Sequence, residues 1–300
     1  MVKLILITGI TSSLGAFLSK QLSAQGHLVY GTSRTISTSE YQTNSNTIYT
    51  VNLSSEISIK RLTCQTFPSS FDLLIHCASA TPSHQLAPID YWNINCAGLT
   101  KLLDTLRRKI KIHSILNVST TSVYDQTAEY LDERDTAHAT TPYGLSKYFA
   151  ETYLSTLTPD LIHRVVSLRV PILVTPDVKN NLIANWLSKL NTNDKLEVFN
   201  PKKMFNALGD GRTISEIASL MLSDEIESGI YNLCSNDMMP VEQFARTFTE
   251  IFYKDPGCVR IAANDRVSAI ISGSRIRNAG IHLRNITDTL SWFRSTIGVP

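Results

Sequence analysis

The chain has 300 residues, of which 43% are hydrophobic, and a formal net charge of +2 at pH 7. This length and apolar content allow a large core in one domain or in one and a half. Without a basic stripe the sequence argues against a nucleic-acid partner, and no apolar run is long enough for a signal peptide or a membrane-spanning helix. The five cysteines include no C-x-x-C pair, which predicts reduced thiols and no structural zinc. We therefore expect a cytoplasmic protein with no partner in the membrane.

The beginning of the chain predicts a strand, a helix and a second strand. Leu4–Ile7 is a short apolar run, apolar residues at helical spacing continue to Gln25, and Leu28–Tyr30 begins the second strand. In the turn after the first strand, Gly9 allows a tight bend and Gly15 allows close packing of helix on strand, as in dinucleotide-binding proteins. The cofactor-binding residues predicted in this turn are Gly9, Thr11, Ser12, Ser13, Leu14 and Gly15.

The middle glycine of such a turn is replaced by Ser12. Its Cβ and hydroxyl would stand where the backbone should approach the phosphates, which either weakens binding or adds a hydrogen bond to it. The competing interpretation is a glycine-rich turn that binds nothing.

The second strand ends in Ser33 and Arg34, where an NAD enzyme usually has a carboxylate for the ribose 2′-hydroxyl. Serine followed by arginine leaves room for a 2′-phosphate and offers it a charge-assisted contact. The pattern therefore favours NADP(H) over NAD(H). The alternative is that Arg34 is a solvated loop residue.

Strand and helix patterns continue to alternate along the chain. Further strands are predicted at Ile48–Val51, Leu73–His76, Ser114–Val118 and Val165–Leu168, with a long helix at Tyr91–Arg108 and isolated helices at Leu182–Leu190, Ile214–Leu222 and Val241–Phe252. This alternation predicts an α/β fold with a doubly wound parallel sheet. We expect a cofactor-binding Rossmann domain at 1–170 and a smaller, mainly substrate-binding region at 171–300, with some segments of it returning to the sheet.

Tyr143 and Lys147 are four residues apart on a predicted helix and therefore share one face of it. Pro142 fits the first turn of that helix, and Thr141 or the threonine before it can cap it. A phenol has a reference pKa of about 10, and a nearby cation favours the phenolate. Such a pair can move a proton beside a nicotinamide. A solvated lysine with a half-buried tyrosine is the alternative for this short pattern.

In order along the chain, these segments resemble the extended short-chain dehydrogenase/reductase family, in particular members that act on nucleotide-linked sugars. The resemblance covers nearly the whole chain. Thr8–Gly15 is similar to the T-G-x-x-G-x-x-G motif, apart from Ser12. Other similar segments are His76–Ser79 (H-x-A), Asn95–Leu99 (N-x-x-G-T), Val118–Tyr124 (the strand with the catalytic Ser or Thr), Leu168–Pro171 (L-R-x-P), Gly229–Leu233 (G-x-Y-N-x) and Ser272–Arg275 (D-x-S-K).

The resemblance implies an NAD(P)-dependent oxidoreductase and assigns roles to its residues. Tyr143 would supply the proton and Thr120 would hydrogen-bond the carbonyl oxygen. Lys147 would lower the pKa of the phenol and hold the ribose hydroxyls, and Asn95 would complete a water relay. Further implied contacts to the cofactor are Ser33, Arg34, Asn52, Leu53, Cys77, Ala78, Ser79, Tyr143, Lys147 and Pro171, and those to the substrate are Thr81, Thr121, Ser122, Arg266 and Arg275.

We expect an NADP(H)-dependent reductase of a keto group on a nucleotide-linked sugar, with a 4-keto-6-deoxy sugar as the favoured substrate. An NAD(P)-dependent C4 epimerase, which uses the same residues and retains its cofactor, is the nearest alternative. A non-catalytic NADP-binding regulator is the alternative of another class, although a sensor does not need Thr120, Tyr143 and Lys147. No metal ligand set is expected, and a homodimer is compatible with the resemblance.

Overall fold

A seven-stranded parallel sheet forms the centre of the computed structural model, which describes residues 1–35, 47–125, 127–157, 159–192, 194–252, 255–262 and 269–298. Its strands are β1 (Leu4–Thr8), β2 (Leu28–Ser33), β3 (Ile48–Thr50), β4 (Ser70–His76), β5 (Lys111–Thr120), β7 (Arg164–Val170) and β12 (Gly229–Asn232). In space they follow the order β12-β7-β5-β4-β1-β2-β3. The predicted α/β fold with a doubly wound parallel sheet is confirmed.

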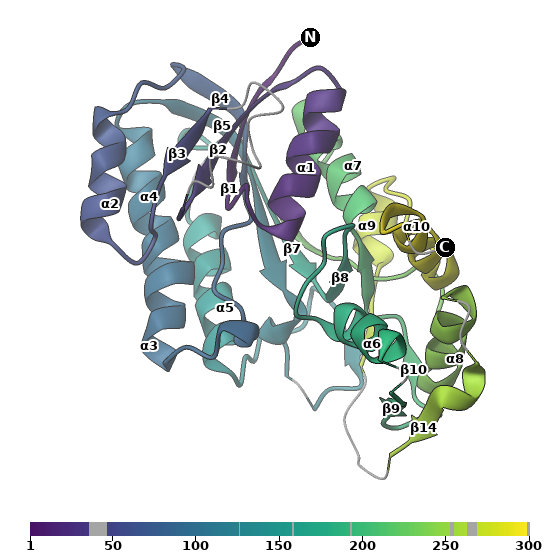
Figure 1. The fold of residues 1–300 in the computed structure, drawn as a ribbon. Coiled ribbons are helices and arrows are strands. Elements are labelled where there is room, and N and C mark those ends of the chain that lie inside the picture. Colours follow the sequence, from purple (N-terminus) through teal and green to yellow (C-terminus); the bar gives the residue numbers. More distant parts are fainter. Residues whose placement is uncertain are drawn as a thin grey trace.

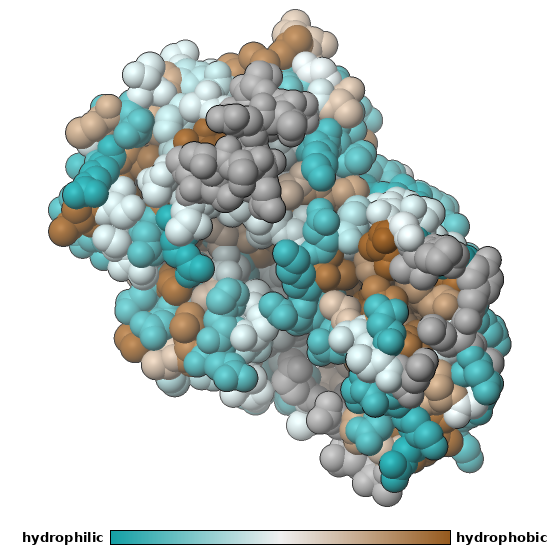
Figure 2. All heavy atoms as spheres, viewed as in Figure 1, coloured by the Kyte–Doolittle hydropathy of each residue, from teal (hydrophilic) through white to brown (hydrophobic). Residues whose placement is uncertain are grey.

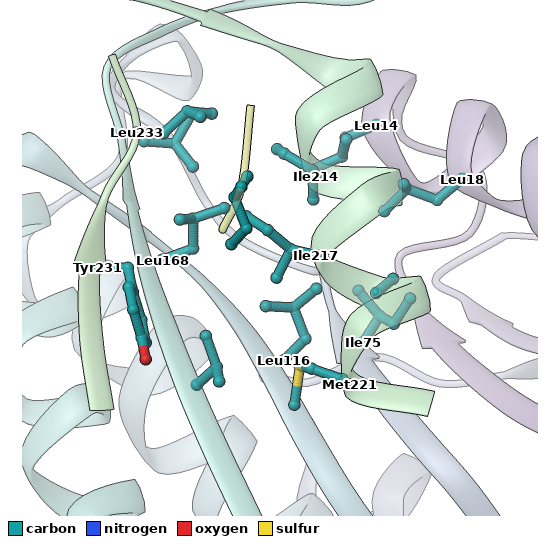
Figure 3. Packing of buried hydrophobic residues seen from close by; sticks show 14 of the residues in the cluster. Leu14, Leu18, Ile75, Leu116, Leu168, Ile214, Ile217, Met221, Tyr231 and Leu233 are labelled. Carbon is teal, nitrogen blue, oxygen red and sulfur yellow. The ribbon is translucent and has the colours of Figure 1, made fainter. Parts of the chain in front are cut away.

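Helices cover both faces of this sheet (Figure 1). On one face lie α1 (Ser13–Ala24) and α7 (Gly211–Leu222), and on the other lie α2 (Glu56–Arg61), α4 (Gly98–Arg107) and α5 (Pro142–Ser155). Successive strand residues point to opposite faces, so Ile75 packs with the first group of helices and Leu74 with the second. Figure 3 shows the first of these cores, in which Leu14, Leu18, Ile214, Ile217 and Met221 meet Ile75, Leu116, Leu168, Tyr231 and Leu233.

The strand order reverses direction between β1 and β4. The chain passes outward from β1 through β2 to β3 and then crosses to β4 on the other side of β1. Ligands of open α/β sheets bind outside the carboxyl ends of the strands at such a switch point. The register aligns Thr8 of β1 with His76 of β4, and Thr120 of β5 with Val170 of β7, so the loops that follow these strands share one edge of the sheet.

The predicted long helix is interrupted. The structure divides it into α3 (Pro88–Tyr91), a π-helical turn (Trp92–Ala97) and α4. A Cβ at Gly98 would lie 2.6 Å from the carbonyl oxygen of Leu53, so the chain passes very close to the loop after β3 at this point. Single π-turns often occur at functional positions. Here the turn carries Asn95, whose amide bonds both backbone groups of Ala80.

The remaining part of the chain builds a separate core. It contains α6 (Leu182–Asn191), α8 (Val241–Ile251) and α10 (Ile286–Thr296), with the short strands β8 (Ile172–Val174), β9 (Leu196–Val198), β10 (Met204–Phe205), β11 (Leu208–Asp210), β13 (Met239–Pro240) and β14 (Val259–Ile261). Aromatic side chains dominate this core, among them Trp186, Phe205, Phe244 and Phe248. The paired short strands β6 (Tyr130–Leu131) and β15 (Ile270–Ile271) and the helix α9 (Ser274–Asn278) pack instead into the core shown in Figure 3. Helices α6, α7 and α8 confirm the three predicted isolated helices. β12 returns to the sheet, while the proposed boundary near residue 170 stays a prediction.

Among the described residues no helix combines the length and apolar character that crossing a bilayer requires.

The surface of the molecule is mixed in character. Figure 2 shows hydrophilic and hydrophobic residues interspersed over the face that it presents. A protein surface normally keeps a large apolar fraction, so scattered apolar residues carry no functional signal by themselves.

Candidate active site

The predicted catalytic side chains lie where the carboxyl end of β5 meets the start of α5. Thr141 caps α5 by accepting a hydrogen bond from the Gly144 N–H (3.0 Å), and Pro142 occupies the first turn, as predicted. A Cβ at Gly144 would overlap the carbonyl oxygen of Ser122. Glycine at this position therefore lets the first turn of α5 press against the turn after Thr120, and this packing brings Tyr143 to Thr120.

Tyr143 is half-buried, and the hydroxyls of Thr120 and Ser79 lie near enough to its phenol to act on its pKa. Burial raises the pKa of Tyr143 above its ordinary value, and these two hydroxyls oppose this only in part. Lys147 is not among the groups that shift the pKa of Tyr143, so its expected lowering of that pKa stays a prediction. In this state Tyr143 is a protonated phenol at neutral pH.

Lys147 is a buried ammonium group without a hydrogen-bond partner among the described residues. The residue is 1% exposed, and its Nζ has no partner. Burial lowers the pKa of Lys147 to about 8, while the nearby Glu151 carboxylate and the Cys77 thiol act in the opposite direction. A buried charge that lacks a partner is costly. The site therefore holds three N–H donors that a ligand's oxygen atoms could occupy.

Asn95 is brought to the site, where protein groups engage its side-chain amide, and its predicted part in a water relay stays a prediction. Its Oδ1 accepts from the Ala80 N–H (2.7 Å) and the Ser79 hydroxyl (3.1 Å). Its Nδ2 donates to the Ala80 carbonyl (2.9 Å) and to the Ser146 Oγ (3.0 Å). A side-chain amide has two donors and two acceptor positions, so all four are taken by protein groups. Asn95 instead ties the segment after β4 to α5, and thereby places Ser79 beside Tyr143.

The glycine-rich turn has the tight geometry that its sequence predicts. Gly9 has φ +67°, and a Cβ there would lie 2.8 Å from the backbone nitrogen of Ala78. A Cβ at Gly15 would overlap the carbonyl oxygen of Gly9. Neither position therefore tolerates a side chain, and α1 begins close to the ends of β1 and β4.

Ser12 performs a role that the sequence analysis did not foresee. It is the N-cap of α1, and its Oγ accepts a hydrogen bond from the Gly15 N–H (3.1 Å). The hydroxyl therefore occupies one of the N–H groups that a helix N-terminus offers to an anion. The next residue, Ser13, is also engaged, since its Oγ lies 2.5 Å from the Oγ1 of Thr175. Thr175, which the sequence did not single out, joins this turn to the segment after β8.

The end of β2 presents one buried and one exposed polar residue. Ser33 is 3% exposed, donates to the carbonyl of Thr35 (2.7 Å) and lies 2.9 Å from the hydroxyl of Thr11. Arg34 follows it and is exposed. Ser33 therefore holds the conformation of this loop through its hydrogen bonds, and Arg34 beside it faces solvent.

Most other predicted contacts follow the carboxyl ends of the strands. After β3 come Asn52 and Leu53, and after β4 come Cys77, Ala78 and Ser79, with Thr81 further along the same loop. After β5 come Thr121 and Ser122, and after β7 comes Pro171. One of the predicted substrate contacts, Arg275, is not brought to this edge. Arg275 lies over the ring of Tyr231 (4.8 Å) and against Gly229, at the start of β12 and so toward the opposite end of the strand. Arg266 is outside the described residues.

A buried ion pair behind α5 was missed by the sequence analysis. Arg169 on β7 and Glu151 on α5 are joined at 2.8 Å, and both are nearly inaccessible to solvent. Ser119 donates a short hydrogen bond to the same carboxylate, and the Arg169 guanidinium lies over the ring of Tyr124 (4.6 Å). The sequence does contain an indication of this pair's position, because Glu151 follows Lys147 by four residues and so by one helical turn.

At the opposite edge of the sheet, the structure assembles a group that sequence spacing did not suggest. One ligand-type atom from each of His113, His163 and Asp224 lies within 4.8 Å of the others. The two imidazole rings are stacked at 4.7 Å, and Arg164 already forms a short ion pair with Asp224. His113 and His163 lie at the amino ends of β5 and β7, and Asp224 lies in the loop between α7 and β12, so this group is separate from the predicted active site.

The fold and the Thr120, Tyr143 and Lys147 arrangement define an enzyme of the extended short-chain dehydrogenase/reductase type. The chain belongs to the NAD dependent epimerase/dehydratase family, which matches residues 5–234. A comparison with curated proteins finds no significant sequence match.

Solved structures share the fold over nearly the full length of the chain. UDP-N-acetylglucosamine 4-epimerase from Bacillus cereus has a TM-score of 0.77 at 17% identity, with 99% of both chains covered. The UDP-glucose 4-epimerase of Thermus thermophilus in complex with NAD has a TM-score of 0.78 at 19% identity, covering 97% of this chain and 99% of that chain. The Bordetella bronchiseptica enzyme WbmG in complex with NAD and UDP has a TM-score of 0.80 at 18% identity, covering 100% of this chain and 97% of that chain.

Proposed function

We propose that this protein transfers hydride at a carbon of a nucleotide-linked sugar, and that it acts as an NADP(H)-dependent reductase of a keto group. The observation that carries the proposal is the buried Lys147, which has no hydrogen-bond partner among the described residues and lies one turn from Tyr143, whose phenol is close to the Thr120 hydroxyl. This set lies at the carboxyl edge of the sheet, where α1 begins with the Gly9–Gly15 turn.

The residues present fit a nicotinamide dinucleotide. Lys147 would hold the ribose hydroxyls, which would supply the oxygen partners that its Nζ lacks among the described residues. The N-terminus of α1 would hold the pyrophosphate, since Gly9 and Gly15 leave no room for a side chain in the turn. When bound, the cofactor supplies or accepts the hydride.

The protonation state of Tyr143 favours the direction of reduction. Negative charge develops on the carbonyl oxygen of a keto group as it is reduced, so the site needs a proton donor there. Burial raises the pKa of Tyr143, which keeps the phenol protonated at neutral pH. Thr120 provides a second hydroxyl beside it.

The cofactor preference is argued from the end of β2. No carboxylate stands at Ser33 or Arg34 to accept from a ribose 2′-hydroxyl, and a carboxylate would repel a 2′-phosphate. The exposed Arg34 guanidinium can pair with that phosphate. We therefore assign NADP(H), although the neighbouring structures described above contain NAD.

The substrate class follows from the family and from what the structural neighbours bind or act on. UDP occupies WbmG, and the two epimerases act on UDP-linked sugars. For this chain we propose a nucleotide-linked sugar with a keto group, a 4-keto-6-deoxy sugar in the first instance.

A C4 epimerase is the second candidate, because two structural neighbours are 4-epimerases that share the fold over 97% or more of each chain. The two functions differ in the fate of the cofactor. A reductase releases NADP⁺ in each cycle, whereas an epimerase retains its cofactor.

The decisive experiment is to purify the protein, identify any bound dinucleotide by mass, and add NADPH with a 4-keto-6-deoxy sugar nucleotide. We expect free exchange of cofactor and consumption of NADPH in proportion to substrate, followed by absorbance at the nicotinamide band. If NAD⁺ survives purification and a hydroxy-sugar nucleotide is interconverted without net absorbance change, the protein is an epimerase.

We also propose that the protein forms a homodimer through the outer face of α3, the π-turn and α5. Ile89, Trp92, Leu145 and Phe149 are between 40% and 61% exposed, and the Trp92 and Phe149 rings lie 5.3 Å apart. A cluster of large apolar side chains at the surface marks an interaction site. Sedimentation should show a dimer that Trp92→Glu with Phe149→Glu converts to a monomer.

A further inference from the structure

We propose that Glu151 is a positioning residue of the candidate active site: with Arg169 and Ser119 holding its carboxylate in place, it keeps the Lys147 ammonium charged. The significance of this for catalysis rests on the proposed function. The effect of Glu151 on the charge of Lys147 does not depend on that function, and it can be measured in the protein without cofactor or substrate.

Glu151 and Lys147 lie on the same face of α5, since they are four residues apart. The Glu151 carboxylate cannot turn toward solvent, because it is buried and fully engaged. Arg169 donates to it through Nε (3.2 Å to each oxygen) and Nη2 (2.8 Å), and Ser119 donates to its Oε1. The carboxylate is therefore a fixed negative charge one turn from the Lys147 ammonium, which has no hydrogen-bond partner in the described part of the chain.

The other titratable groups that face Lys147 carry no charge at neutral pH. Burial raises the pKa of the Cys77 thiol to about 12, so it remains protonated. Burial lowers the pKa of His76 to about 3, with a further contribution from the charge of Lys147, so its imidazole is neutral. Among the described residues that influence Lys147, Glu151 is thus the charged one.

Arg169 has a structural reason to be present as well. Its guanidinium lies over the Tyr124 ring, whose hydroxyl donates to the Oδ1 of Asn232 (2.8 Å) on β12. These contacts anchor the carboxylate to the sheet as well as to its own helix. If Glu151 served only this anchoring, its loss would destabilise the fold and leave the titration of Lys147 unchanged.

Asp210 offers a matched control for that structural role. Its carboxylate is also buried, also pairs with an arginine (Arg212, 2.6 Å) and also accepts from a threonine (Thr289, 3.1 Å), but it lies at the start of α7 and is not among the groups that influence Lys147. Asp210→Asn therefore removes a comparable ion pair elsewhere in the fold.

The test follows the titration of Lys147 by NMR in protein labelled with ¹³C at the lysine Cε, with the resonance assigned from Lys147→Arg. In Glu151→Gln we expect the midpoint to fall by about one pH unit or more, the lower end for loss of an opposite charge nearby. Asp210→Asn should leave it unchanged. An unchanged midpoint in Glu151→Gln, or an equal fall in both variants, overturns the proposal.

Glu151→Gln leaves the Arg169 charge buried without its partner and can fail to fold. The double variant Glu151→Gln with Arg169→Met removes both charges and is measured in the same way. Its midpoint should also fall below that of the unchanged protein, and a wild-type midpoint there overturns the proposal. Failure of the proposed function is recognised separately, because it would leave these midpoints as predicted while no keto-sugar nucleotide is reduced.

Discussion

The two ends of the proposed cofactor site differ in how many of their polar groups already have hydrogen-bond partners within the protein. At the start of α1, Ser12 caps the Gly15 N–H, and Ser13 is paired with Thr175. At α5, Lys147 is buried with no hydrogen-bond partner among the described residues. The first end is stable without a ligand, whereas the second carries a free-energy cost that a ligand can relieve. Four substitutions test this difference.

The largest effect is expected on the free energy of unfolding when the Lys147 charge is removed. Burial lowers its pKa from 10.5 to about 8, so Lys147→Met should stabilise the protein by on the order of 3 kcal/mol at pH 7. The unfolded chain binds the proton more tightly, so the cost in the native state is full below pH 8 and disappears as the pH rises to 10.5. The gain should therefore shrink over that range, as measured by urea unfolding at several pH values.

The same variant should bind a nicotinamide dinucleotide more weakly, as measured by calorimetry. A matched substitution of an exposed lysine, Lys101→Met, should change neither quantity comparably, because Lys101 is a surface residue paired with Glu56. If Lys147→Met is destabilised at pH 7, the buried ammonium stabilises the fold and the proposed free-energy cost is wrong.

Tyr143→Phe tests the chemistry at the same end. It should leave cofactor binding nearly intact and reduce turnover by about 10²-fold or more, the lower end for a positioned general acid. Tyr91→Phe is the control. The centroids of the Tyr91 and Tyr143 rings are 6.2 Å apart, but Tyr91 has no proposed part in proton transfer. Near-normal turnover in Tyr143→Phe would remove the phenol from the mechanism.

Arg34→Ala tests the adenosine side of the site. It should weaken NADPH binding by about 1.5 to 3 kcal/mol, the range for a hydrogen bond to a charged group, with little change for NADH. Titration of both cofactors measures the difference. Equal losses for the two would show that Arg34 does not bind the 2′-phosphate.

The smallest effect is expected for Ser12→Gly at the pyrophosphate end. Replacing an N-cap serine by glycine costs only a few tenths of a kcal/mol of stability. It also frees the Gly15 N–H that the hydroxyl now occupies, so dinucleotide binding should improve slightly, as measured by calorimetry. Weaker binding in this variant would mean that the Ser12 hydroxyl itself contacts the phosphates.

Secondary structure and the order of the motifs could be predicted from the sequence because both depend on local periodicity. Apolar runs such as Leu4–Ile7 define buried strands, and the four-residue spacing of Tyr143 and Lys147 places them on one helical face whatever surrounds them. The Thr141 cap and Pro142 start α5 for equally local reasons. These elements alone implied the doubly wound sheet and the edge at which the site forms.

Only the tertiary structure decided which polar groups are satisfied, because their partners are distant in the chain. Asn95 has all four of its amide hydrogen bonds made by protein groups, and Arg275 lies over Tyr231 instead of near Thr120. Glu151 meets Arg169 through the packing of α5 on the sheet. Such pairings depend on strand order and register, which bring residues from separate segments together without any signal in their spacing. The sequence therefore determined which residues could do the chemistry, and the fold determined which of them remain available for it.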